Sequence, residues 1–276
     1  MPTRGRSKAG LTAALGEFAE RQTVRLLENF KSAFIGRDHE GVHDLRVDAK
    51  RLRAYVRLIE RIDPDFDAAE VFKPVRRLFR AAGALRDARV QIGLLAGAAA
   101  PGLSTERLGE WINELKDREM KARRLFEADA KTFNPGALTR LKSRAARSLG
   151  KMTEARVAAR AEQMLQIQLE RLRDPSSMNR LGDRELHEIR IRSKEARYTL
   201  EMIDRRGGRP GARAGLDARL RSVHQALGRW HDRQVAMDGL IRFLRHGITG
   251  PVCHRDAYEA YLGLLREFRR RFGPAE

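Results

Sequence analysis

Residues 43–60 read HDLRVDAKRLRAYVRLIE, and residues 187–204 read HEIRIRSKEARYTLEMID. In both stretches apolar residues recur every three or four positions, which is the period of a helix that buries one face in a core. The predicted core residues are Leu45, Ala49, Leu52, Val56 and Ile59 in the first stretch, and Ile189, Ala196, Leu200 and Ile203 in the second. Each stretch therefore predicts an amphipathic helix.

The two stretches also align with each other. His43, Arg46, Lys50 and Arg53 match His187, Arg190, Lys194 and Arg197 at a constant offset of 144 residues. A second pair of blocks follows in the same order, since FRAAGALRDARV at 79–90 aligns with HQALGRWHDRQV at 224–235. Two matching pairs of blocks in one order within one chain indicate an internal duplication.

Helical periodicity continues through the rest of the chain, and no convincing alternating strand pattern interrupts it. Breaks rich in Gly and Pro divide the chain into eight predicted helices, at 9–35, 39–62, 66–98, 104–131, 137–173, 181–205, 212–246 and 252–272. Asp38 and Asp183 are predicted helix N-caps, and Ser104 with Thr105 caps the fourth helix.

We therefore expect an all-α fold of two tandem four-helix bundles related by pseudo-twofold symmetry. The first bundle is expected at 9–134 and the second at 137–276, after a disordered basic segment at 1–8.

The composition points to an anionic partner. The chain has 276 residues, with 56 Lys and Arg against 37 Asp and Glu, so its net charge is +19. Of the basic residues 46 are Arg, which favours binding of nucleic acid, an acidic membrane or polyphosphate. The alternative is an Arg-rich genome that produces a solvated basic surface.

Several classes of protein are excluded by the sequence. Cys253 is the single cysteine, so there is no disulfide framework and no CxxC zinc site. Glu17 interrupts the short apolar stretch near the start, which excludes a secretory signal there, and the weakly polar run at 92–103 is broken by Gly and Pro. We expect a cytoplasmic protein without membrane association.

The basic residues form rows on the polar faces of the predicted helices, and these rows are the candidate binding site. The rows are His43, Arg46, Lys50, Arg53 and Arg57; His187, Arg190, Lys194 and Arg197; Lys73, Arg76 and Arg80, with Arg221 as a counterpart; and Arg140, Arg144, Arg147 and Lys151. Glu201 shortens the second row. Like charges at these spacings repel one another, so an anion that neutralises them explains the rows, and cross-helix salt bridges are the alternative.

Other polar residues are given structural interpretations. Asp87 and Asp232 are expected to orient an arginine or close a helix contact, since a carboxylate would weaken anion binding. The histidines that begin two of the rows are either ligand contacts or packing residues. The pairs His39/His43 and His224/His231 lack a third ligand, so no metal site and no cofactor are predicted.

At HDLRVDAKRLR and HEIRIRSKEARY, with ALRDARV and ALGRWHDRQV, the chain resembles the CHAD family of conserved-histidine α-helical domains. The resemblance implies two four-helix bundles whose basic helices bind inorganic polyphosphate, and association with bacterial polyphosphate granules. It also implies that the histidines and basic residues of both motifs contact the ligand. The chain departs from its own repeat at Glu195, where the first repeat has Arg51, and at Gln225, where it has Arg80.

The composition is consistent with that ligand. Polyphosphate offers phosphates without bases, so it needs many Arg and Lys contacts and no aromatic stacking, and aromatic residues make up only 6% of the chain. A sequence-independent RNA- or DNA-binding protein is the alternative. No ExExK, Walker or HExxH motif and no clustered carboxylate set is present, so we expect a binding protein rather than an enzyme.

Overall fold

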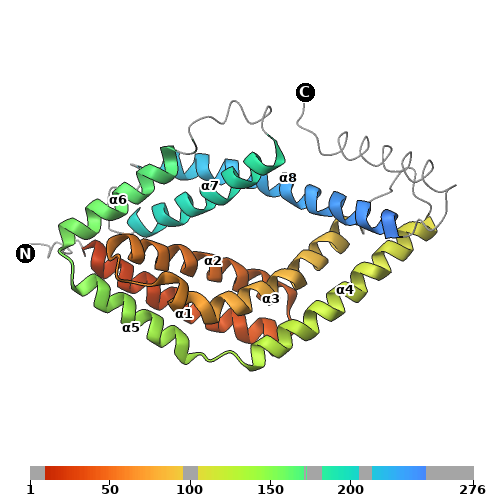
Figure 1. Ribbon diagram of the computed structural model, residues 1–276, viewed down its shortest axis with the longest axis horizontal. Coiled ribbons are helices and arrows are strands. Elements are labelled where there is room, and N and C mark those ends of the chain that lie inside the picture. Colours follow the sequence, from red (N-terminus) through yellow and green to blue (C-terminus); the bar gives the residue numbers. More distant parts are fainter. Residues whose placement is uncertain (1–9, 96–104, 171, 173–181, 205–212, 247–276) are drawn as a thin grey trace, which may run out of the picture. The chain divides into compact units, whose positions relative to one another are not determined.

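The computed structural model describes residues 10–95, 105–170, 172, 182–204 and 213–246 (Figure 1). All regular secondary structure in these ranges is helical. The helices are α1 (Leu11–Phe34), α2 (His39–Ile62), α3 (Ala68–Leu95), α4 (Thr105–Lys131), α5 (Gly136–Gly150), α6 (Glu154–Glu170), α7 (Asp183–Asp204) and α8 (Ala214–His246). The all-α prediction is confirmed for the part of the chain that the structure describes.

The chain divides into two compact units, and neither coincides with a predicted half. The first unit holds 1–83 and 126–228, so it contains α1, α2, α5, α6, α7 and parts of α3, α4 and α8. The second unit holds the remaining parts of α3, α4 and α8. Each unit thus draws on both sides of the Asn134-Pro135-Gly136 break, whereas the sequence places the boundary there.

The start of α2 shows why the chain turns at this point. Arg37 adopts a φ of 52°, and Asp38 follows as the N-cap, accepting hydrogen bonds from the Glu40 N–H at 3.1 Å and the Gly41 N–H at 2.9 Å. These backbone hydrogen bonds lower the pKa of Asp38. The predicted cap is confirmed. At Gly41 a Cβ atom would lie 2.8 Å from the Ala33 backbone nitrogen, so glycine permits the close approach of α1 and α2.

The core of the first unit is built on α1 and α2, which lie side by side. All five predicted core residues of α2 are buried, among them Leu45, Leu52 and Ile59. On α7, Ala196, Leu200 and Ile203 are buried as well, while Ile189 is only half-buried. The hydrophobic pattern therefore identified the faces that pack inward.

Asp48 is a buried carboxylate within this apolar interface. It accepts hydrogen bonds from Gln22 Nε2 and Asn29 Nδ2 of α1, each at 2.7 Å. Arg25 and Arg51 lie at 3.7 and 3.6 Å from its Oδ1. These partners compensate the cost of burying the charge and fix the register of α1 on α2.

The predicted helix at 137–173 is wrong as a single element, because it consists of α5 and α6. The helical hydrogen bonds stop at Gly150, and Thr153 begins the next helix by accepting a bond from the Arg156 N–H at 3.3 Å. A threonine side chain competes for backbone N–H groups in this way, and the periodicity does not reveal the interruption.

The remaining predictions of helix boundaries concern Asp183, Ser104 and the two ends of the chain. The structure places Asp183, a predicted N-cap, as the first residue of α7, and the preceding Gly182 N–H donates to Glu185 at 2.9 Å. The predicted cap at Ser104, the disordered segment at 1–8 and the predicted helix at 252–272 lie outside the described residues. None of the helices in the described ranges combines the length and apolar composition needed to cross a membrane.

Candidate anion-binding site

Four cations from two helices converge on one histidine of a third helix. Lys50 comes from α2, Arg190, Lys194 and Arg197 come from α7, and His224 lies on α8. Burial, together with the positive charges of Lys194, Arg197, Arg190 and Lys50, lowers the pKa of His224 to about 4. We call these five residues the His224 cluster. At neutral pH its imidazole is uncharged and its four neighbours are positive.

The helical spacing of the repeat positions these cations. Arg190, Lys194 and Arg197 are separated by four and three residues, so they lie on one face of α7. Lys50 is the residue of α2 that matches Lys194 in the repeat. α2 packs against α7 (Figure 1), and Lys50 of α2 and Lys194 of α7 both act electrostatically on His224, so these two matching cations of the repeat lie near one another.

Two reciprocal ion pairs join α2 to α7. Arg57 pairs with Glu195, and Arg51 Nε lies 3.4 Å from Glu201 Oε2, so the two helices run antiparallel. Arg51 and Glu195 occupy matching positions of the repeat, and so do Arg57 and Glu201. At these two positions the second motif has a glutamate where the first motif has an arginine. An arginine there would face an arginine of α2, whereas the glutamate forms an ion pair with it.

Exchanging the charges of Arg57 and Glu195 tests whether these two side chains interact directly. We expect Glu195→Arg to reduce the free energy of unfolding by about 1 kcal/mol, because the new arginine faces Arg57 on a partly exposed surface. Burial and Arg57 already lower the pKa of nearby Arg53, whereas Glu195 opposes that shift. The double variant Arg57→Glu/Glu195→Arg should regain most of the loss in urea unfolding. Equal instability of the single and double variants would refute the pairing.

Arg46 packs against an aromatic ring and a glycine of α3. Its guanidinium carbon lies 5.0 Å from the centre of the Phe79 ring, a cation–π arrangement. A Cβ atom on Gly83 would collide with Arg46 Nη1, so the glycine shared by both repeats makes room for this side chain. In the repeat, His224 stands where Phe79 stands, and Arg190 where Arg46 stands. The second repeat therefore presents an imidazole to its arginine in place of a phenyl ring.

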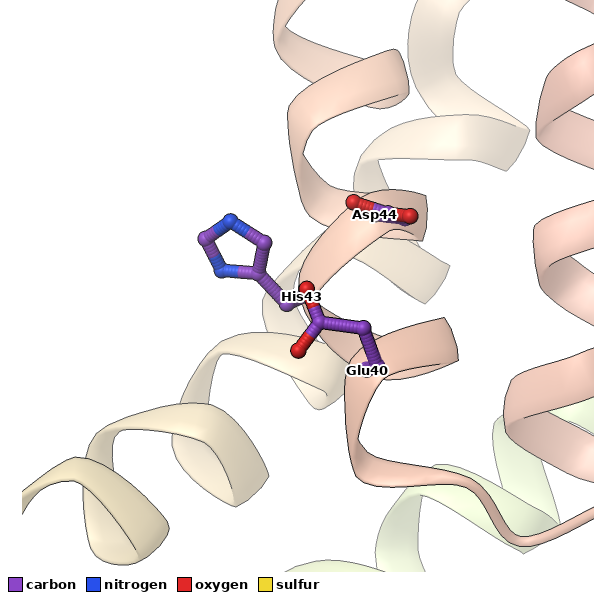
Figure 2. A group of neighbouring side chains, drawn as sticks. All are labelled: Glu40, His43 and Asp44. Atoms are coloured by element: carbon purple, nitrogen blue, oxygen red, sulfur yellow. The ribbon is translucent and has the colours of Figure 1, made fainter. Parts of the chain in front are cut away.

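His43 has two carboxylates beside it. Glu40, His43 and Asp44 each offer a ligand atom, and these atoms lie within 4.8 Å of one another (Figure 2). All three come from the first turns of α2, and His43 and Asp44 are half-buried. A comparison of histidine positions alone does not reveal this grouping, because two of its three members are acids. His43 therefore has two acidic neighbours, whereas His224 has four basic ones. His187, the matching residue, is exposed on α7.

The predicted row of α5 is divided by ion pairs. Arg144 pairs with Glu70 at 2.7 Å, and Lys151 Nζ lies 3.6 Å from Asp63 Oδ2. Arg147 is exposed, and no acid pairs with it among the described residues. The cross-helix salt bridges considered as an alternative from the sequence therefore exist for two of the four residues of this row.

The other predicted residues line two concave surfaces of the first unit. Lys73, Arg76, Arg80 and Arg140 share a cavity of about 610 Å³. Arg221 lines a cavity of about 400 Å³ with Arg51 and Arg197, but three acids line it as well, and Asp217 lies 2.5 Å from Arg221. Of these two surfaces, only the first is predominantly basic.

Asp87 and Asp232 lie on exposed faces of α3 and α8 in the second unit. Both have a polar or electrostatic partner in the structure. Their expected structural role stays a prediction.

His224 is the site residue that sequence reasoning missed. In the sequence it was considered only as a metal-binding partner of His231. The available signal was its alignment with Phe79, since a ring that faces an arginine in one repeat indicates that the matching residue faces an arginine in the other.

Comparison with known proteins places this arrangement in a family. Residues 17–240 match the family model described as the CHAD domain. The crystal structure of the CHAD domain from the plant Ricinus communis is similar, with a TM-score of 0.74 and 20% sequence identity, over 99% of this chain and 93% of that chain. PptA from Streptomyces chartreusis is similar with a TM-score of 0.63 and 17% identity, over 96% of this chain and 98% of that chain. No curated protein sequence matches. Because the family model spans most of the sequence and includes both basic motifs, the chain belongs to the CHAD domain family.

Proposed function

We propose that this CHAD domain binds inorganic polyphosphate, without chemical turnover, through the His224 cluster. The observation that supports the proposal most strongly is the convergence of Lys50, Arg190, Lys194 and Arg197 on one half-buried imidazole. Membership in the CHAD family supports the same ligand. The proposal includes association with polyphosphate granules in the cytoplasm.

The electrostatics of the cluster favour a polyanion. Four cations gathered around a neutral imidazole repel one another, and a chain of phosphates relieves that repulsion at several points together. Arg197 Nε is buried and has no hydrogen-bond acceptor within the described ranges. A buried donor of this kind is normally satisfied, and a phosphate oxygen is a suitable acceptor.

The proposal also covers the symmetry of the domain. Two tandem four-helix bundles, at 9–134 and 137–276, would place α2 and α7 in equivalent positions. The reciprocal pairs Arg57–Glu195 and Arg51–Glu201 support this interpretation, because a twofold relation between the two helices exchanges one pair with the other. The polyphosphate would then contact matching residues of both repeats.

Competition between polyphosphate and RNA tests the ligand. We expect long-chain polyphosphate to displace fluorescent single-stranded RNA at a far lower phosphate concentration than unlabelled RNA or DNA, because the cluster supplies four cations and no Phe, Tyr or Trp side chain. Fluorescence anisotropy at one fixed salt concentration measures the displacement. If RNA displaces labelled polyphosphate equally well, the chain is a general nucleic-acid-binding protein and the proposal fails.

A further inference from the structure

Glu40, His43 and Asp44 form a compact group of metal-ligating side chains at the start of α2, and we call this group the α2 triad (Figure 2). Glu40 precedes His43 by three residues and Asp44 by four, so all three lie on one face of the helix. Their donor atoms lie within 4.8 Å of one another. The sequence predicts no metal site because its histidine pairs lack a third ligand, whereas the triad combines one histidine with two acids. None of its residues belongs to the His224 cluster.

The two acids of the α2 triad are not neutralised by the protein. Neither the Glu40 nor the Asp44 carboxylate has a hydrogen bond or an ion pair with any residue that the structure describes. Like charges four residues apart on a helix repel one another, and Asp44 is half-buried, which adds a cost of desolvation. A divalent cation held by both carboxylates would relieve the repulsion and compensate this cost.

The second repeat neutralises the acid at its corresponding position. The residues that match the α2 triad are Arg184, His187 and Glu188 of α7. Glu188 lies 3.8 Å from Arg184 and 3.0 Å from Arg192, so two arginines balance its charge. The first repeat has Glu40 in place of the first of these arginines. The full set of one imidazole and two carboxylates is therefore present in α2, and the matching positions of α7 lack it.

The charges around the α2 triad allow a cation to approach. Asp38 accepts hydrogen bonds from two N–H groups at the N-terminus of α2, which compensates the positive end of the helix dipole. The two arginines that flank the triad in the sequence contact other groups. Arg37 Nε lies 3.3 Å from Glu127 Oε1, and the Arg46 guanidinium packs over the Phe79 ring.

We infer that the α2 triad binds a divalent transition-metal ion, for which Zn²⁺ is the simplest probe. One imidazole nitrogen and two carboxylate oxygens are a donor set that suits Zn²⁺, at bond lengths of about 2.0–2.2 Å, whereas Mg²⁺ prefers oxygen ligands alone. Two donor atoms of one such ion lie up to about 4 Å apart, so small rotations of these partly exposed side chains bring all three onto it. The inference goes beyond the proposed function, because it concerns a metal ion and residues outside the His224 cluster.

Isothermal titration calorimetry with Zn²⁺ tests the inference on the full chain. The site variant is His43→Gln/Asp44→Asn, and the matched control is His187→Gln/Glu188→Gln, which makes the same change of charge at the corresponding positions of α7. We expect the unaltered chain and the control to bind one Zn²⁺ that the site variant binds at least about 100-fold more weakly. Loss of a group that only supports a ligand costs about 10–100-fold in metal affinity, and this variant loses two ligands. The visible absorption of the Co²⁺-loaded chain should change in the site variant and persist in the control.

Three outcomes would overturn the inference. The first is a site variant that binds Zn²⁺ as tightly as the control, and the second is an equal loss of affinity in both variants. The third is displacement of Zn²⁺ by Mg²⁺ at a similar concentration, because the imidazole would then not be a ligand. Should circular dichroism show that the site variant disturbs the helix, Glu40→Gln repeats the test at an exposed side chain and should still weaken Zn²⁺ binding. Polyphosphate is absent from these titrations, so none of the outcomes bears on the proposed function.

Discussion

The variant Lys50→Glu/Lys194→Glu is expected to bind long-chain polyphosphate roughly 100-fold more weakly than the unaltered protein, or worse. Hydrogen bonds to charged groups contribute about 1.5–3 kcal/mol each, so loss of two contacts costs about 3 kcal/mol, and each 1.4 kcal/mol is a factor of about ten in Kd. The substitutions remove one cation from α2 and the matching cation from α7. Repulsion between the new carboxylates and phosphate adds to the loss.

The control Arg124→Glu/Arg156→Glu has the same net charge and alters arginines outside the His224 cluster. Fluorescence anisotropy with labelled polyphosphate should show only a small change for this control. Circular dichroism should show equal helix content in both variants, because Lys50 and Lys194 are only half-buried. An affinity loss of the same size in both variants would mean that net charge alone determines binding, contrary to the account.

The substitution Asp48→Ala should reduce the free energy of unfolding by about 3 kcal/mol. Removal of one partner from a buried ionic network costs about 3–5 kcal/mol, and the partial exposure of Arg25 places this case at the lower end. The variant leaves the amide groups of Gln22 and Asn29 without their acceptor, next to the buried residues of α1 and α2.

Urea unfolding followed by circular dichroism measures this effect. Glu17→Ala is the matched control, since Glu17 is an exposed acid of α1 whose ion pair, among the residues that the structure describes, is with Arg21 one turn away. Its loss should stay within about 0.5 kcal/mol. If Asp48→Ala unfolds at the same urea concentration as the control, Asp48 does not hold α1 on α2.

The sequence was sufficient for the parts of the fold that depend on local pattern. The apolar spacing within 43–60 predicted the buried face of α2, and the breaks on either side, with Asp38 as the cap, predicted its bounds. The resemblance to the CHAD family was confirmed by the family match. The break between α5 and α6 was not predicted, because α5 ends at Gly150 and Thr153 caps the start of α6 without any change in the apolar period.

The site could be predicted only in part, because its geometry depends on contacts between helices. Lys50 and Lys194 were identified from their rows, but their meeting at His224 requires α2, α7 and α8 to pack together. The same holds for Glu195. In the sequence Glu195 only interrupts the basic face of its helix, whereas in the structure it forms an ion pair with Arg57 of α2. A row on one helix does not reveal which acids of neighbouring helices will pair with its members.

Contacts with neighbouring helices also explain why the members of one predicted basic row have different surroundings. Arg144 and Lys151 share a row with Arg140, yet acids of neighbouring segments pair with the first two, while the third lines the cavity of about 610 Å³. Helical spacing therefore predicts which residues share a face, and the surrounding helices decide which of them are available to a ligand.

Titration of His224 by NMR, with and without polyphosphate, tests the central claim most directly. In the free protein, burial and four cations hold the pKa of His224 at about 4. Phosphates bound at Lys50, Arg190, Lys194 and Arg197 would offset those charges, so we expect the pKa to rise toward its ordinary value of 6.5.

The complex would then take up a proton, and affinity should increase as pH falls from 6.5 toward 4. The His224→Phe variant identifies the resonance and restores the aromatic residue of the first repeat. A clear rise in the pKa of His224 on addition of polyphosphate places the ligand at the cluster. An unchanged pKa at saturating polyphosphate would show that the ligand binds elsewhere and would contradict the account.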